Sequence, residues 1–233
     1  MEQKRADLRI QGVSRAPGGH YRSVAIDGVS KVEGPVRSDG PFVMNGTVRV
    51  FGDVRTEELN VNGQLKIKGR LSFGTSQIDG YLKVDGSVDG ERLALHGLLK
   101  AGGDCEAERF EGEGGFDIGG LLNAGTLDVR LYAGGKAREI GGDVIRVRRT
   151  ARSVWKKMWL WMVPKRHLEL KADLIEGDEV DLENTIASVV RGNRVVVGPG
   201  CRIGRVEYRS ELIKRPGARI EEEVKFGDGN RLA

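Results

Sequence analysis

The amino-acid sequence predicts an all-β fold, a β-helix whose coils are about seventeen residues long. Two observations support this: glycine pairs recur at one spacing, and apolar residues alternate with polar residues between them. The two glycines of each pair are six residues apart: Gly28/Gly34, Gly46/Gly52, Gly63/Gly69, Gly80/Gly86, Gly97/Gly103 and Gly114/Gly120. Self-similarity at a short fixed period is typical of a solenoid, in which each coil contacts only its neighbours.

Alignment of the coils on the first glycine of each pair places apolar residues in columns. The columns stand four and two positions before the glycine, and two, four and eight positions after it. The column two positions after it contains Ser30, Val48, Leu65, Leu82, Leu99, Phe116 and Ala133. A spacing of two indicates strands whose alternate side chains face inward. Asx–Gly steps such as Asn62-Gly63 indicate corners, because both residue types tolerate left-handed conformations.

In chain order, Leu8–Gly12 fits the template one coil before the first pair, so about eight coils are expected between Leu8 and Ala137. Stacked at ~4.8 Å they form a rod roughly 38 Å long. We predict regular coils over 1–146 and less regular coils over 171–220, where the repeat shortens to fifteen residues, as between Ile175 and Val190. Residues 221–233 are expected to form a polar, frayed tail.

The interruption between the two sets of coils, 147–170, is basic and contains every tryptophan of the chain. Ser153 is a suitable N-cap and Pro164 a stop signal, so Ser153–Val163 is predicted to form a short amphipathic helix. The candidate membrane or partner contacts are Arg149, Arg152, Trp155, Lys156, Lys157, Trp159 and Trp161. Such a helix can lie on an anionic membrane surface. The alternatives are that it packs on its own rod or on a protein partner.

A second charge feature is the column three positions after the glycine: Lys31, Arg49, Lys66, Lys83 and Lys100. This column either binds an anionic polymer or forms a solvated face that discourages sideways aggregation.

The sequence shows no catalytic motif. Cys105 and Cys201 fall on inward positions and are expected to be small core residues, and His96 belongs to a corner column. No metal-ligand spacing, nucleotide loop or nucleic-acid module is present, so no cofactor and no nucleic-acid partner are expected. With no signal peptide and no apolar run of about 18 residues, the protein is expected to be cytoplasmic, either free or peripheral at the inner face of the cell membrane.

Three runs of sequence resemble the bactofilins, polymer-forming bacterial cytoskeletal proteins. These runs are Lys100–Glu108, Gly119–Ala124 and Val189–Cys201, and the last resembles the longer members found in Firmicutes. The resemblance implies a right-handed β-helix that assembles end to end into non-polar filaments without nucleotide. It also implies a scaffold for cell-envelope, shape or motility proteins as clients. Many members carry a membrane-targeting N-terminal tail, but Met1–Ala6 is short and polar, which moves any membrane contact to Ser153–Val163.

Two classes of function therefore remain. The first is a structural homopolymer whose coil ends pair between subunits, with Leu8, Ile10, Val24 and Ile26 supporting one interface. Pairing of this kind satisfies the backbone groups that a terminal coil leaves open. The second is a β-helical enzyme or carbohydrate-binding protein, similar to the hexapeptide-repeat transferases. The missing catalytic constellation favours the first.

Overall fold

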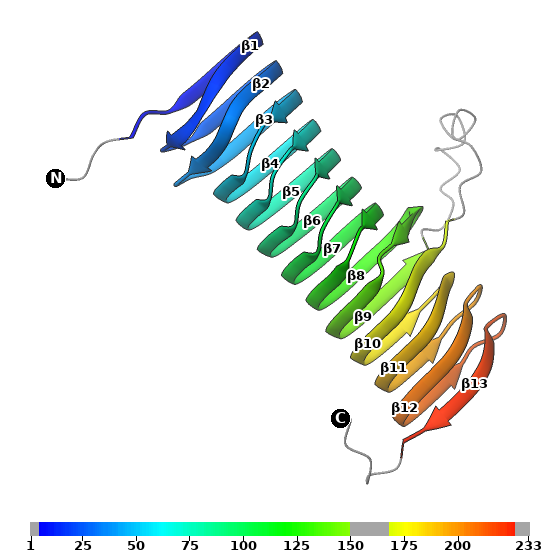
Figure 1. Ribbon diagram of the computed structural model, residues 1–233. Helices are drawn as coiled ribbons and strands as arrows, with labels where there is room; N and C mark the ends of the chain where they lie inside the picture. Colours follow the sequence, from blue (N-terminus) through cyan, green and yellow to red (C-terminus); the bar gives the residue numbers. More distant parts are fainter. Residues whose placement is uncertain (1–4, 150–167, 227–233) are drawn as a thin grey trace, which may run out of the picture.

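The computed structural model describes residues 5–149 and 168–226, and all regular secondary structure within them is β-strand (Figure 1). The strands are β1 (Leu8–Tyr21), β2 (Val24–Ser38), β3 (Pro41–Val50), β4 (Val54–Ile67), β5 (Leu71–Val84), β6 (Val88–Ala101), β7 (Cys105–Ile118), β8 (Leu121–Lys136), β9 (Glu139–Arg149), β10 (Leu170–Leu182), β11 (Thr185–Val197), β12 (Arg202–Lys214) and β13 (Arg219–Lys225). Each pairs in parallel with the next, so the chain forms one rod-shaped β-solenoid.

The register of the first strands confirms the predicted columns as far as Gly114; beyond it Phe116 pairs with Gly135, so Ala133 does not continue its column as predicted. Gly28 pairs with Gly46, and Gly46 with Gly63. Leu8 pairs with Val24, so the coil predicted ahead of the first glycine pair is present. Leu82 is 0% exposed, like most other inward-facing residues. The core is therefore a continuous narrow column of side chains, and each coil covers the core residues of the coil before it.

The corner glycines are required by the neighbouring coil. Gly63 has a φ of +119°, which L-residues rarely adopt, and a Cβ at this position would lie 2.2 Å from the carbonyl oxygen of Gly46. Gly80 stands in the same relation to Gly63, with a φ of +142°. A glycine column therefore lets successive backbones approach closely at this corner.

The later coils follow the predicted fifteen-residue repeat at first and then lengthen. Ile175 pairs with Val190. Ile186 then pairs with Arg202, so Cys201 does not align with Ile186 as the repeat predicted. The added residue lies in the turn that ends at Cys201. Cys201 is still buried, as is Cys105, and both are free thiols.

The expectation of a frayed tail from residue 221 is wrong for its first residues. Glu221–Lys225 belong to β13, and Glu222 pairs with Arg205 of β12 in register. Ile220 packs against the core. The Glu222 carboxylate accepts a hydrogen bond from Arg205 at 2.8 Å, so the acidic run adds ion pairs to the last coil.

The described strands on either side of the interruption pair with neighbouring parts of β8. The last residue of β9, Arg149, pairs with Leu131, and the first of β10, Leu170, pairs with Gly135. The predicted helix Ser153–Val163 lies outside the described residues, as do Arg152, Trp155, Lys156, Lys157, Trp159 and Trp161. In the part that is described, no helix is long and apolar enough to cross a membrane.

Candidate functional site

The basic column predicted from five residues extends along the whole rod. The residues that follow the glycine corner form one side of each coil, with Val48 and Val50 inward and Arg49 outward between them. Strand pairing connects the equivalents of Arg49 in every coil: Arg15, Lys31, Arg49, Lys66, Lys83, Lys100, Asp117, Lys136, Lys171, Ile186, Arg202 and Arg219. We call this column the basic ladder; ten of its twelve positions are lysine or arginine.

Sequence reasoning found only the part of the ladder with a constant repeat. β8 has extra residues at Tyr132–Gly134, where the pairing jumps from Gly114–Leu131 to Phe116–Gly135. The next step to Lys171 then crosses the interruption. A basic residue directly before a buried one recurs in these coils, as in Lys136-Ala137 and Lys171-Ala172. This pattern could have located the later members of the ladder.

Few ladder cations are neutralised. Lys100 Nζ lies 2.6 Å from the Asp117 carboxylate, Lys83 lies 3.3 Å from Asp85, and Arg202 lies 2.9 Å from Glu169. The hydrogen bond to Asp117 raises the pKa of Lys100, so this ammonium stays charged. Among the described residues, seven ladder cations have no carboxylate partner: Arg15, Lys31, Arg49, Lys66, Lys136, Lys171 and Arg219.

Exposed apolar side chains lie beside the ladder. Val13, Val29 and Leu98 belong to one column, two positions before the ladder residue of their coils. Tyr132 follows Leu131 in the bulge of β8, and Phe51 follows Arg49 by two positions. Val13 is 88% exposed and Val29 is 52% exposed. We call the ladder together with these five side chains the basic face; they are all the large exposed apolar residues in the described part of the chain.

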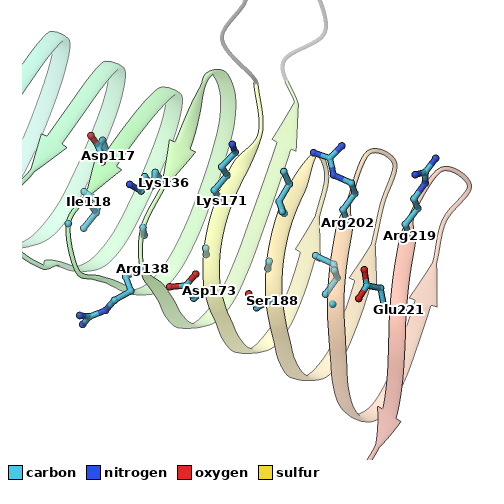
Figure 2. A pocket seen from close by; sticks show the side chains of 17 residues that line it. Asp117, Ile118, Lys136, Arg138, Lys171, Asp173, Ser188, Arg202, Arg219 and Glu221 are labelled. Carbon is cyan, nitrogen blue, oxygen red and sulfur yellow. The ribbon is translucent and has the colours of Figure 1, made fainter.

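The basic face is hollowed in its C-terminal half (Figure 2). Lys136, Lys171, Arg202 and Arg219 project in a row along a depression of about 840 Å³. The inward-facing residues here are small, including Ala137, Ala172 and Ala187. Small side chains at these positions leave room above the core. The hollow is therefore a continuation of the ladder surface with a cationic rim.

A second hollow, of about 520 Å³, is lined by both acidic and basic residues. Among its carboxylates, Glu176 is held by Arg191 at 3.0 Å, and the same guanidinium lies 2.7 Å from Glu207. Within the described residues, no group of three or more His, Cys, Asp or Glu side chains is placed to hold a metal ion.

The residues predicted for end-to-end contact occupy two successive coils. Leu8 and Ile10 lie in β1, where Leu8 is partly buried and Ile10 is 7% exposed. Val24 and Ile26 lie one coil deeper, fully buried beneath their β1 partners. The terminal surface therefore consists of β1, and the two β2 residues support it from below. Of the predicted membrane contacts, only Arg149 is described; its backbone N–H donates to Glu183 at 3.2 Å.

The last two residues that the sequence singled out are Cys105 and His96. Burial raises the pKa of the Cys105 thiol to about 12, so it is protonated at neutral pH. His96 is exposed in the corner column, as predicted, with Nδ1 3.4 Å from Asp79. Neither arrangement provides an activated nucleophile or base.

Comparisons with known proteins find relatives without an assigned function. The chain is 42% identical over 108 residues to an uncharacterized protein of Bacillus subtilis (strain 168), YhbF, and 42% identical over 110 residues to a second, YhbE. The matches cover 46% and 47% of this chain. They span less than half of each relative, 42% of YhbF and 44% of YhbE. No protein-family model and no solved structure matches the chain.

Proposed function

We propose that this protein is a structural, cytoskeletal protein that self-assembles end to end into filaments without nucleotide. The observation that carries the proposal is the state of the rod's two ends. β1 and β13 are the outermost strands of the sheet, and within the described residues each pairs on one side only. Open N–H and C=O groups of an edge strand are a template for pairing with another chain.

The resemblance to bactofilins supports the same proposal. From it we take the finer features: a right-handed coil, filaments without polarity, and a role as a scaffold for envelope, shape or motility proteins. Head-to-head and tail-to-tail contacts are each self-complementary, and their alternation gives a filament without polarity. Head-to-tail stacking would instead continue the parallel pairing of the rod.

Electron microscopy of the purified protein, with and without nucleotide, tests the proposal. We expect filaments in both conditions. Ile10→Lys places a charge in the terminal coil and should disperse them, while circular dichroism shows that the β-structure is retained. Ile26 is a poorer position for this test than Ile10. It lies one coil deeper, so a charge there would lie inside the core. Val43→Lys, on the partly exposed flank of β3, is the matched control and should assemble normally. Filaments that persist unchanged in Ile10→Lys would rule out an N-terminal end contact.

A carbohydrate-binding or catalytic role remains the second candidate, and the second hollow is the observation that favours it. Carboxylates and amides such as Glu139, Asp178 and Asn193 lie there with Phe226, a combination of polar and aromatic groups that suits sugars. Binding of soluble glycans that is lost in Asp178→Asn, in a protein that forms no filaments, would favour this role over the structural one.

The basic, Trp-rich interruption stays a sequence-based prediction. If Trp155, Trp159 and Trp161 contact lipid, their replacement by serine should release the protein from anionic vesicles without abolishing filaments. If the helix packs on the rod, the same change should lower thermal stability instead.

A further inference from the structure

We propose that the basic face docks on the surface of an anionic lipid bilayer, with the rod lying parallel to the membrane plane. This inference concerns the flank of the rod, so it goes beyond the end-to-end assembly proposed above. It also involves a surface different from the interruption 147–170. Three observations carry it: the ladder's charge, the apolar residues beside it, and the straightness of the column.

The first observation is the charge of the basic face. Its cations are the ten ladder residues, and Lys68 and Arg138 stand two positions after the ladder. The carboxylates in or beside the ladder are Glu33, Asp85, Asp117, Glu169, Asp173 and Glu221. In the neighbouring corner column, four successive coils have acidic or neutral residues and no cation: Asp27, Asn45, Asn62 and Asp79. Stacked like charges repel across neighbouring strands. An anionic partner along the whole column relieves that repulsion.

The second observation decides between kinds of anionic partner. A polyanion in solution offers phosphates or carboxylates but no apolar phase. Val13 and Val29, which are mostly exposed, gain nothing from such a partner. At a lipid interface, aliphatic and tyrosine side chains enter the boundary of the acyl chains while neighbouring cations meet the head groups. The basic face provides both kinds of residue, because Val13, Val29 and Leu98 stand two positions from Arg15, Lys31 and Lys100.

The third observation is the shape of the column. Arg15 and Arg219 are separated by eleven strand spacings, which at ~4.8 Å each correspond to roughly 53 Å. Because the ladder follows paired positions of one continuous sheet, its cations lie along one side of the rod. The strands that carry them are stacked in a row (Figure 1). A planar surface can meet such a line at many points at once, so weak contributions add. The hollow beside Lys171 and Arg202 provides space for head groups in the C-terminal half.

The test is flotation of the full-length protein with vesicles, which separates lipid binding from the sedimentation of filaments. The probes are phosphatidylglycerol–phosphatidylcholine vesicles and pure phosphatidylcholine vesicles. Lys31→Gln, Arg49→Gln and Lys66→Gln are combined in one variant, because none of these cations has a carboxylate partner among the described residues. Each cation near an anionic surface strengthens binding by about fivefold, so the triple variant should bind roughly a hundredfold more weakly. Binding should also weaken as salt is added.

The matched control changes the same charge on other sides of the rod: Arg37→Gln, Arg55→Gln and Arg92→Gln. It should bind anionic vesicles as the wild type does, within a fewfold. A second variant, Val13→Ser with Val29→Ser, keeps all charges and should also bind more weakly. Its side chains are exposed, so thermal unfolding should be unchanged.

Several outcomes would overturn the proposal. One is that the wild type fails to float with anionic vesicles. Another is that the ladder variant and the control lose binding equally, since the effect would then depend on net charge alone. If Trp155, Trp159 and Trp161→Ser abolishes flotation while the ladder variant keeps it, the contact belongs to the interruption. Binding to polyphosphate in solution without flotation would assign the ladder to a soluble polyanion. None of these outcomes bears on filament formation, which electron microscopy reports separately.

Discussion

The coils on the two sides of the interruption differ in how regularly they stack. In the first set, from Gly46 to Gly114, the pairing repeats every seventeen residues and the backbones approach at a glycine corner. In the second set the offset changes from fifteen residues, between Ile175 and Val190, to sixteen, between Val190 and Val206. Uniform coil length allows one corner geometry to repeat, whereas changing length does not.

Side chains of the second set connect the coils where the corners differ. The Arg191 guanidinium joins three successive coils, because it contacts Glu176 of β10 and Glu207 of β12. Arg194 and Arg205 form further pairs with the next coil, to Glu211 at 2.7 Å and to Glu222 at 2.8 Å. Ion pairs between coils occur in both sets, as between Lys68 and Asp85 in the first. The comparison therefore contrasts a repeated glycine corner in the first set with a three-coil arginine contact in the second. Four variants, taken from the largest expected effect to the smallest, test this difference.

Leu82→Ala should produce the largest loss, about 2–5 kcal/mol of unfolding free energy. Leu82 is fully buried between Leu65 and Leu99 in the narrow core. Its neighbours therefore have little freedom to fill the cavity that the truncation leaves. Chemical denaturation of the purified protein measures this cost. A cost below about 1 kcal/mol would mean that the site collapses readily and that the narrow core is not rigid.

Gly80→Ala should cost about 1–3 kcal/mol, because the φ of +142° is strained for alanine. The new Cβ would also lie 2.1 Å from the Gly63 carbonyl oxygen. Gly141→Ala is the matched control, since the nearest atom to its Cβ, Asn123 Oδ1, is 3.2 Å away. Equal melting temperatures for the two variants would contradict the idea that backbone approach at the corner stabilises the first set.

Arg191→Gln should destabilise the second set by about 1–3 kcal/mol, because it leaves the nearly buried Glu207 carboxylate with only the longer contact to Arg205 at 3.7 Å. Arg194→Gln removes an exposed pair and should cost less than about 1 kcal/mol. Hydrogen exchange should locate the loss of protection in β10–β12. If both variants behave alike, the three-coil contact contributes no more than a surface pair.

Sequence reasoning predicted the fold most successfully where one period holds. From Gly46 to Gly114 a constant offset aligns every column, so inward residues such as Leu65 and Leu82 follow directly from the alternation. Alignment failed at Cys201 because an added turn residue shifts the register without changing the apolar pattern. Glu221–Lys225 were assigned to the tail because a run of acidic residues is typical of solvated chain. The arginine partner of Glu222, Arg205, lies a coil earlier in the sequence.

The candidate site shows the same limit. Five cations of the ladder were recognised as a column. Lys136, Lys171, Arg202 and Arg219 follow a bulge or the interruption, where sequence distance no longer reports spatial position. Arg15 lies in the first coil, where the offset to Lys31 is sixteen residues. The exposed apolar residues were missed for a different reason. Val13 and Val29 occupy outward positions of strands that also contain many buried valines, and composition does not separate the two kinds.

Acid should loosen the first coil before the interior, and this is the smallest effect expected. Hydrogen bonds from Arg22 and Ser23 hold the pKa of Asp7 well below its ordinary value of 3.8. The stabilisation is therefore present above about pH 4 and is lost as the pH falls further and Asp7 takes up a proton. Asp53 lies in a coil away from the ends of the rod, and Arg70 lowers its pKa as well. Coils stack on both sides of this one. Hydrogen exchange at pH 5 and near pH 2 should show β1 losing protection first, and Asp7→Asn should reproduce that loss at pH 5. Equal protection of β1 and β5 under acid would mean that the rod's end is held by its core contacts alone.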